Sequence, residues 1–175
     1  MQRISLININ MFYKKILFYI FGIFISTFFT LLLLEFVLNF FPVNEGLRSQ
    51  AVNINNPVFR FEPNRTATYS KHWNFDIKNK VKVNNYGYVN NYDYDNNLKT
   101  PLLSIIGDSY VEALMVPFTQ TISGLLQNET SNKRVYSFAA SGAGLSQHLI
   151  WAQFARTEFK SDFFIFFIIA NDFME

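Results

Sequence analysis

The segment Ile16–Leu34 limits what this chain can fold into, because its nineteen consecutive residues carry no charge. A helix of this length, at about 1.5 Å per residue, crosses the ~30 Å hydrocarbon layer of a membrane. Its few hydroxyl side chains can bond to carbonyls of the same helix. We therefore predict a transmembrane anchor helix over residues 16–41, preceded by a cytoplasmic N-terminus over residues 1–15.

Charges beside the anchor predict its orientation. Arg3, Lys14 and Lys15 precede the apolar run, and the first acidic residue is Glu35. The positive-inside rule places the N-terminus in the cytoplasm, and everything after Pro42 outside the inner or plasma membrane. A cleaved signal peptide is less favoured, since the run is long and no small-x-small cleavage site follows it. A buried core helix or an interfacial helix would carry a polar face.

Composition argues against several function classes. The net charge of +2 is small and scattered, so nucleic-acid binding is not expected. Without cysteine, the chain has no disulfide, thiolate metal site or cysteine nucleophile. Asp93, Asp95 and Asn97 are spaced like the start of a calcium loop, but the glycine and glutamate of such a loop are missing. We therefore expect a solvated loop there, and neither a metal nor a cofactor.

Residues 42–100 are predicted to form a linker and a small β-rich lead-in. Alternating apolar and polar residues indicate short strands, and Asn-rich stretches indicate turns and loops. The expected strands are Val58–Phe61, Thr66–Tyr69 and Lys80–Val83, with a turn at Asn84–Gly87 and a polar loop over Asn90–Asn97.

Residues 101–175 show a strand–helix alternation typical of an α/β fold with a parallel sheet and helices on both faces. In such sheets the ligand site lies at the carboxyl ends of the strands. Ile122, Leu125 and Leu126 are expected to share the apolar face of the first helix. The expected elements are strands Leu102–Ile106, Arg134–Phe138 and Phe163–Ala170, and helices Thr119–Asn128 and Leu145–Phe159.

Small or polar residues follow each of these three strands. Gly107, Asp108 and Ser109 follow the first, Gly142 follows the second, and Asn171 follows the third. We expect Gly107 to turn the chain sharply, and Ser109 to open a loop with its hydroxyl facing the cleft. A serine oxygen near backbone N–H groups and an amide donor has the parts needed to attack an ester and stabilise the resulting oxyanion.

These strand ends resemble the first three sequence blocks of the SGNH (GDSL-type) hydrolase superfamily. The matching segments are Ile105–Tyr110, Tyr136–Gly144 and Phe167–Asp172. The resemblance implies a flavodoxin-like three-layer fold, of which this chain holds the first three strands. It also implies that Ser109 is the nucleophile and first oxyanion donor, with Gly142 and Asn171 as the other donors and Gly107 and Asp108 flanking the serine.

The lead-in also resembles that of membrane-anchored bacterial members of the superfamily. The matching segments are Phe61–Asn64 and Val83–Tyr88, although Val89 stands where those proteins often have arginine. The resemblance implies a cofactor-free ester hydrolase or acyl transferase. Its expected substrates are O-acyl groups of envelope glycans or lipids.

One part of the family pattern has no counterpart here. No Asp-x-x-His segment, which supplies the general base, is present, and His148 is expected to be a partly exposed helical residue instead. A strand as apolar as Phe163–Ala170 would be an aggregation hazard at a sheet edge, which also favours a C-terminally truncated domain. Two alternatives remain open: a non-catalytic binding protein with this fold, and a decayed gene fragment.

Overall fold

The computed structural model describes residues 2–130 and 134–173; the side chains of residues 2–10 and of Asn171 lie outside this description. The chain divides into two compact units, Met1–Pro42 and Val43–Glu175.

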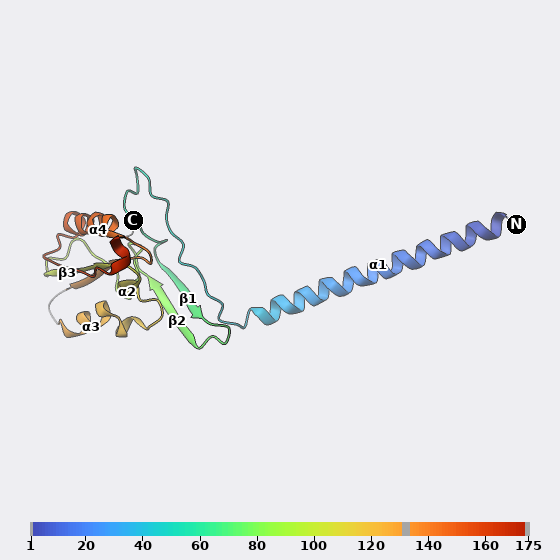
Figure 1. The fold of residues 1–175 in the computed structure, drawn as a ribbon, viewed down its shortest axis with the longest axis horizontal. Helices are drawn as coiled ribbons and strands as arrows, with labels where there is room; N and C mark the ends of the chain where they lie inside the picture. Colours follow the sequence, from blue (N-terminus) through green and yellow to red (C-terminus); the bar gives the residue numbers. More distant parts are fainter. Residues whose placement is uncertain (1, 131–133, 174–175) are drawn as a thin grey trace. The chain divides into compact units, whose positions relative to one another are not determined.

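The first unit is one long helix, α1 (Gln2–Leu38) (Figure 1). Its segment Met11–Leu38 is long and apolar enough to cross a membrane, a property that signal sequences share, and none of it is buried. The predicted span Ile16–Leu34 lies within it. The helix ends before the predicted residue 41, because Pro42 disfavours helical geometry in the residue before it.

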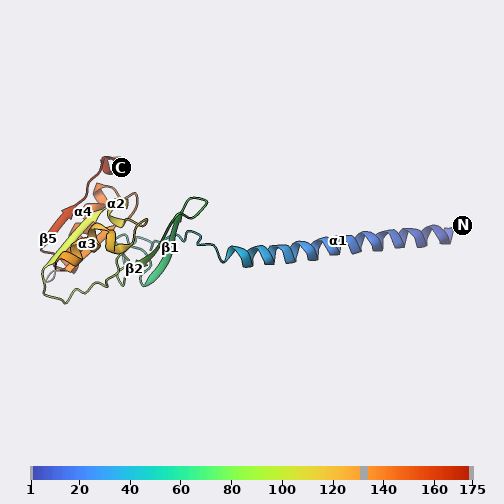
Figure 2. The same ribbon diagram turned by 90° about the horizontal axis from the view of Figure 1, so that it is seen from below.

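The lead-in of the second unit contains an antiparallel hairpin, β1 (Arg65–Lys71) and β2 (Ile77–Val83) (Figure 2). Both strands are longer than predicted. The predicted strand Val58–Phe61 was wrong, since only a single bridge, between Ser49 and Phe61, forms there. Pro57 and Pro63 flank this segment and lack the N–H groups that a longer ladder would need.

The predicted turn Asn84–Gly87 is confirmed. Gly87 N donates to Asn84 O at 3.1 Å, and Asn84 Oδ1 accepts from the N–H groups of Tyr86 and Tyr88. Gly87 has a φ of 85°, and a Cβ there would lie 2.3 Å from Phe61 O. Glycine is therefore required at this position both for its φ and for the close approach of the neighbouring chain.

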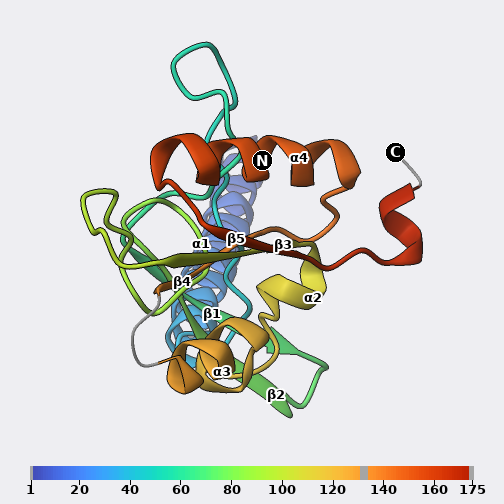
Figure 3. The same ribbon diagram turned by 90° about the vertical axis from the view of Figure 1, so that its left-hand side faces the viewer.

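The second unit has at its centre a three-stranded parallel sheet of order β4-β3-β5. The strands are β3 (Leu102–Gly107), β4 (Arg134–Ala139) and β5 (Phe163–Phe166). Helices α3 (Ile122–Glu129) and α4 (Leu145–Glu158) cover opposite faces of this sheet (Figure 3). The predicted α/β class, with a small parallel sheet after an apolar helix, is confirmed.

The last strand differs from the prediction in length and burial. β5 ends at Phe166, and the chain then runs into a 3-10 turn, η2 (Ala170–Phe173). Asp172 closes this turn by accepting from Ile169 N at 2.8 Å. Phe163 and Phe166 are 52% and 41% exposed, because β5 pairs with β3 alone among the described residues.

The first helix of the sheet region begins later than predicted. Residues Phe118–Gln120 form a separate 3-10 turn, η1, and Thr121 then caps α3 by accepting from Gly124 N at 3.1 Å. Ile122 and Leu126 pack toward the sheet as expected, but Leu125 is 53% exposed. With about 3.6 residues per turn, Leu125 lies at the edge of the face that holds Ile122 and Leu126, and it remains in contact with solvent.

The lead-in and the sheet share one hydrophobic core. Tyr94 stacks on Tyr136 with ring centroids 3.8 Å apart, and Tyr88 packs edge-on against Phe138 at 4.8 Å. The buried residues of this hydrophobic core, taken from both regions, are Val58, Phe61, Val83, Tyr88, Tyr94, Leu102, Ile106, Tyr136, Phe138, Ala140, Trp151, Ala155 and Phe159. Many phenylalanine and tyrosine side chains of the second unit therefore pack between the lead-in and the sheet region, and this packing holds the two together.

Candidate functional site

Ser109 lies at the carboxyl end of β3 and begins a short helix, α2 (Ser109–Glu112). Asp108 caps this helix, its Oδ1 accepting from Tyr110 N at 3.0 Å. The half-buried Ser109 donates its hydroxyl to Asp108 Oδ2 at 3.4 Å. The expectation that Ser109 opens a loop was wrong, because the Asp108 side chain is a good N-cap and starts a helical turn.

Glycine is needed at position 107 because neighbouring side chains pack closely against its Cα. A Cβ at Gly107 would lie 2.5 Å from Val111 Cγ2 and 3.2 Å from Phe167 Cβ. Its φ is not positive, so the sharp turn that we expected does not account for glycine here. Without a side chain at this position, α2 and the segment after β5 can both close over the end of β3.

Gly142 lies in the loop that follows β4. This loop turns through a bond from Ala143 N to Ala140 O at 3.1 Å, and Gly142 itself has a φ of 80°. Gly142 is exposed, and nothing lies within 4 Å of a Cβ built on it. Because β3 and β4 are parallel neighbours, the Ser109 helix and the Gly142 loop leave the same edge of the sheet.

Glu112, which was not predicted from the sequence, joins these two segments. Its side chain is 4% exposed, and its Oε2 accepts from Ser141 N at 2.9 Å and from Ser141 Oγ. Burial raises the pKa of Glu112 above its ordinary value, the Ser141 hydrogen bonds oppose this rise, and nearby Asp108 adds to it. The only available signal was an acidic residue within an otherwise apolar run, three residues after Ser109.

The third strand end is described in part. The backbone of Asn171 lies in η2, and its side chain lies outside the described part of the structure. Asp172 beside it is 1% exposed; its Oδ2 accepts from Ile169 N, and its Oδ1 has no partner among the described residues. The oxyanion role expected of Asn171 therefore stays a prediction.

His148 is buried, contrary to the expectation of a partly exposed residue. It is 1% exposed, stacks on Trp151 at 6.2 Å, and neither ring nitrogen has a partner among the described residues. His148, Trp151 and Ala155 form the stripe of α4 that faces the sheet. His72, in the hairpin, is bonded to Asp76 at 2.7 Å. Within the described structure, neither histidine is hydrogen-bonded to Ser109.

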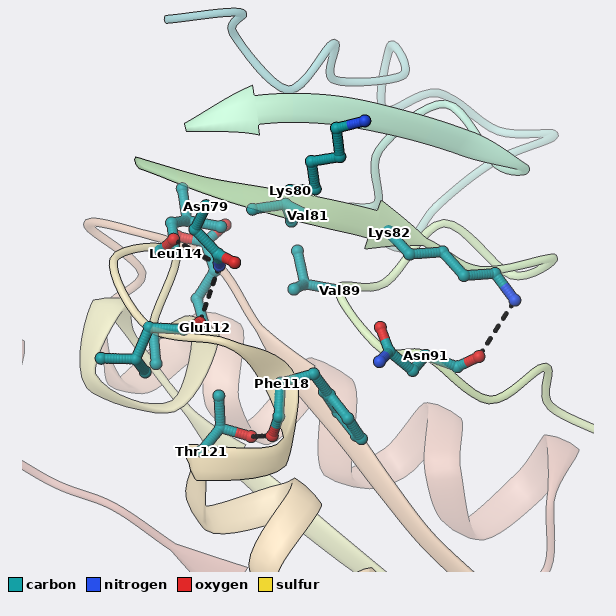
Figure 4. A pocket seen from close by; sticks show the side chains of 12 residues that line it. Asn79, Lys80, Val81, Lys82, Val89, Asn91, Glu112, Leu114, Phe118 and Thr121 are labelled. Atoms are coloured by element: carbon teal, nitrogen blue, oxygen red, sulfur yellow. Dashed lines mark hydrogen bonds between the residues drawn. The ribbon is translucent and has the colours of Figure 1, made fainter. Parts of the chain in front are cut away.

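The loop after α2 is braced by the lead-in hairpin. Asn79 of β2 donates from Nδ2 to Leu114 O at 2.9 Å and to Val116 O at 2.7 Å (Figure 4). Thr121 then donates to Phe118 O at 2.8 Å, which closes η1 beneath the same loop. The position of α2, and with it that of Ser109, therefore depends on the hairpin as well as on the sheet.

The acidic loop that resembles the start of a calcium site makes local interactions. Asp93 pairs with Lys82 at 3.2 Å, and Asp95 Oδ1 accepts from Asn97 N at 2.8 Å. Among the described residues, no group of three or more His, Asp or Glu side chains is arranged to hold a metal ion.

A cavity of about 410 Å³ opens beside Gly142, and we call it the α4 pocket. Its walls come from the loop after β4, the start of α4, and Phe59 of the lead-in. The lining residues are Phe59, Ala140, Ser141, Gly142, Ala143, Gly144, Ser146, Gln147 and Trp151. Trp151 Nε1 donates to Phe59 O at 3.0 Å, so the lead-in wall is fixed to the helix wall.

Comparisons of this chain with protein-family models, with curated proteins and with solved structures found no match. The fold defines an α/β protein with a small parallel sheet and an N-terminal apolar helix long enough to cross a membrane. At the carboxyl-terminal edge of that sheet lie a serine, an exposed glycine and a buried glutamate.

Proposed function

We propose that this chain is a membrane-anchored serine ester hydrolase or acyl transferase of the SGNH type. One observation carries the proposal: Ser109 and the Gly142 loop leave neighbouring parallel strands at the same edge. Glu112 connects them through Ser141. A nucleophile and an N–H donor held together in this way suit acyl transfer, because the donor stabilises charge that develops on the ester oxygen.

The roles follow from the resemblance and from this arrangement. Ser109 attacks the ester carbonyl carbon, and its own N–H, Gly142 N–H and the Asn171 amide stabilise the oxyanion. The bond between the carbonyl carbon and the alcohol oxygen then breaks, the serine proton passes to the departing alcohol, and the acyl group remains on Ser109 until water or an acceptor hydroxyl takes it. The expected substrates are O-acyl groups on envelope glycans or lipids.

The membrane location is part of the same proposal. Helix α1 anchors the chain in the inner or plasma membrane, and Arg3, Lys14 and Lys15 hold its N-terminus in the cytoplasm. The chain contains no cysteine, so single cysteines can report the orientation. Asn97→Cys, in the exposed polar loop, should react with a membrane-impermeant maleimide on intact cells, whereas Gln2→Cys should react only after lysis. The opposite pattern would reject this orientation.

The function is tested by labelling membranes of the native host with a fluorophosphonate probe. We expect the wild-type protein to be labelled and Ser109→Ala to be unlabelled. Ser70→Ala, which removes a hydroxyl from the distant strand β1, is the matched control and should label normally. An unlabelled wild-type protein that also fails to hydrolyse acyl esters would refute the proposal.

The general base is the missing part of this mechanism. Without one, Ser109 is a weak nucleophile at neutral pH, and within the described structure neither histidine is hydrogen-bonded to it. A general base must therefore act on Ser109, and its apparent pKa should appear in the pH dependence of fluorophosphonate labelling.

Neither ring nitrogen of His148 has a partner among the described residues, and this observation favours a second candidate, a non-catalytic binding protein. In that case Ser109→Ala would leave the phenotype of the native host unchanged. The enzyme proposal predicts loss of that phenotype.

A further inference from the structure

The loop between β1 and β2 presents an exposed tryptophan. Trp73 is 90% exposed, although tryptophan is highly buried on average in folded proteins. Two bonds close the loop around it: Phe75 N donates to His72 O at 3.3 Å, and His72 Nδ1 is hydrogen-bonded to Asp76 Oδ1 at 2.7 Å. One exposed aromatic side chain needs no explanation by itself, so its surroundings decide what it fits.

Exposed lysines flank this loop on both strands. Lys71 ends β1, and Lys78 and Lys80 share one face of β2, because residues two apart in a strand point the same way. Within the described part of the chain, none of the three forms an ion pair. Asp76 is the single acidic residue between Lys71 and Lys80, and it is bonded to His72. Residues 71–80, which we call the hairpin tip, therefore carry a net positive charge.

The first residues of the second unit are bonded to this hairpin. Glu45 N donates to Thr68 O at 2.7 Å, and Glu45 Oε2 accepts from Thr68 N at 2.7 Å. Asn44 Oδ1 accepts from Ser70 N at 3.2 Å. Glu45 follows Leu38, the last residue of the apolar span, by seven positions, and seven residues reach at most about 25 Å. The chain connection alone therefore keeps β1 within reach of the surface of the membrane that holds the span.

A membrane surface fits these features together. Tryptophan is enriched where the membrane meets water, because its ring is apolar and its N–H can stay hydrated. A lysine near a surface of anionic lipid is attracted by about 1 unit of charge, which strengthens binding about fivefold. A protein partner would also fit Trp73, but it would not account for the bonds between this hairpin and the residues that follow the span.

We propose that the hairpin tip docks on the headgroups of anionic phospholipids in the membrane that holds α1. Trp73 lies at the membrane–water interface, and Lys71, Lys78 and Lys80 pair with lipid phosphates. This second contact restricts how residues 43–175 can turn on the membrane. The inference goes beyond the proposed function, since it does not depend on the chemistry of Ser109.

Quenching of tryptophan by brominated lipids measures this contact in the full-length protein. The chain has two tryptophans, and Trp151 is 0% exposed, so Trp73 is the one that lipid can reach. The protein is reconstituted into vesicles of phosphatidylcholine and phosphatidylglycerol, with or without bromine on the acyl chains.

We expect bromination to lower the emission of the wild type by about one third, because an interfacial ring lies close to the chains. It should leave the emission of Trp73→Phe unchanged. Since Trp73 is exposed, this substitution leaves the core intact. Equal emission of the wild type in both kinds of vesicle would overturn the proposal.

Charge variants test the role of the lysines. With Lys78→Gln and Lys80→Gln combined, the ratio of docked to undocked hairpin should fall about 25-fold, and most of the quenching should be lost. Lys99→Gln combined with Lys160→Gln removes the same charge from exposed positions outside the hairpin, and this matched control should be quenched like the wild type.

Lipid composition separates attraction by charge from simple proximity. In vesicles of phosphatidylcholine alone, the wild type should show the weak quenching of the variant with both hairpin lysines replaced. Undiminished quenching without phosphatidylglycerol would overturn the anionic lipid as the partner. Equal losses in the two pairs of lysine variants would overturn the hairpin tip as the docking surface.

Discussion

Glu112 is the residue on which the candidate site depends most. It is buried, it belongs to the same helical turn as Ser109, and it fixes the Gly142 loop through two hydrogen bonds from Ser141. Buried carboxyl groups with shifted pKa values cluster at functional sites. We therefore regard Glu112 as a positioning residue, which acts through Ser141 on the donors beside it.

Glu112 should make stability depend on pH. Its pKa is raised in the folded state, so the folded state holds this proton more tightly than the unfolded state does. The stabilisation is fully present below the ordinary carboxyl pKa of about 4.3 and is lost as the pH rises through the raised value.

Glu112→Gln tests this effect, because glutamine keeps the acceptor oxygen and cannot ionise. The free energy of unfolding of Glu112→Gln minus that of the wild type should increase as the pH rises from about 4 to about 8, because only the wild type loses the stabilisation. Urea unfolding at several pH values measures the difference. A difference that does not change with pH would contradict the raised pKa.

Gly107 tests the packing around Ser109. In Gly107→Ala the new Cβ would meet Val111 and Phe167, and overpacking of this kind destabilises by about 1–3 kcal/mol. Gly46→Ala is the matched control, since nothing lies within 4 Å of a Cβ there and its φ is not positive. Urea unfolding of both variants should separate them, and equal stability would argue against the packing role.

At the scale of elements, the two outer strands of the sheet, β4 and β5, differ in how their outer edges are hydrogen-bonded. The outer edge of β4 is covered, because Tyr94 OH donates to Ser137 O at 2.7 Å and accepts from Ser137 N at 2.8 Å. On β5, Ser161 Oγ donates to Phe163 O at 3.1 Å, and β3 is the one strand among the described residues that pairs with β5. An apolar edge strand without a second strand neighbour pairs readily with other chains.

Ile165→Lys should therefore slow aggregation of the detergent-free second unit. Ile165 is 36% exposed, so the lysine can reach solvent at little cost in stability, and a charge on an edge strand disfavours pairing. Leu149→Lys, at a 67% exposed position on α4, is the matched control. Light scattering over time should show the larger effect for Ile165→Lys; equal effects would mean that net charge, and not the edge, is responsible.

At the scale of the whole molecule, residues 43–175 form one compact unit. Lead-in aromatic residues such as Tyr88 and Tyr94 are buried against the sheet, and Asn79 braces the loop after α2. The lead-in is therefore part of the folded domain and more than a spacer after α1.

This unit should fold without the helix. A chain of residues 43–175 should be soluble and unfold cooperatively, and a shorter chain of residues 101–175 should not, because it lacks five of the thirteen buried residues of the shared core. Circular dichroism during thermal unfolding measures both. A cooperative transition in the shorter chain would contradict the structural role of the lead-in.

Sequence alone determined the apolar helix, the alternation of strands and helices, and the placement of Ser109 and Gly142 at strand ends. These features are local, since they follow from runs and periods of apolar residues and from the residues that interrupt them. The turn at Asn84–Gly87 was predicted for the same reason.

Tertiary structure alone decided the features that depend on distant neighbours. Burial of His148, the bond from Ser141 to Glu112, the exposure of β5 and the pocket between Phe59 and Trp151 each join segments far apart in the chain. A periodic pattern shows that a side chain faces inward, but only the packed neighbours fix whether it is covered and what it contacts.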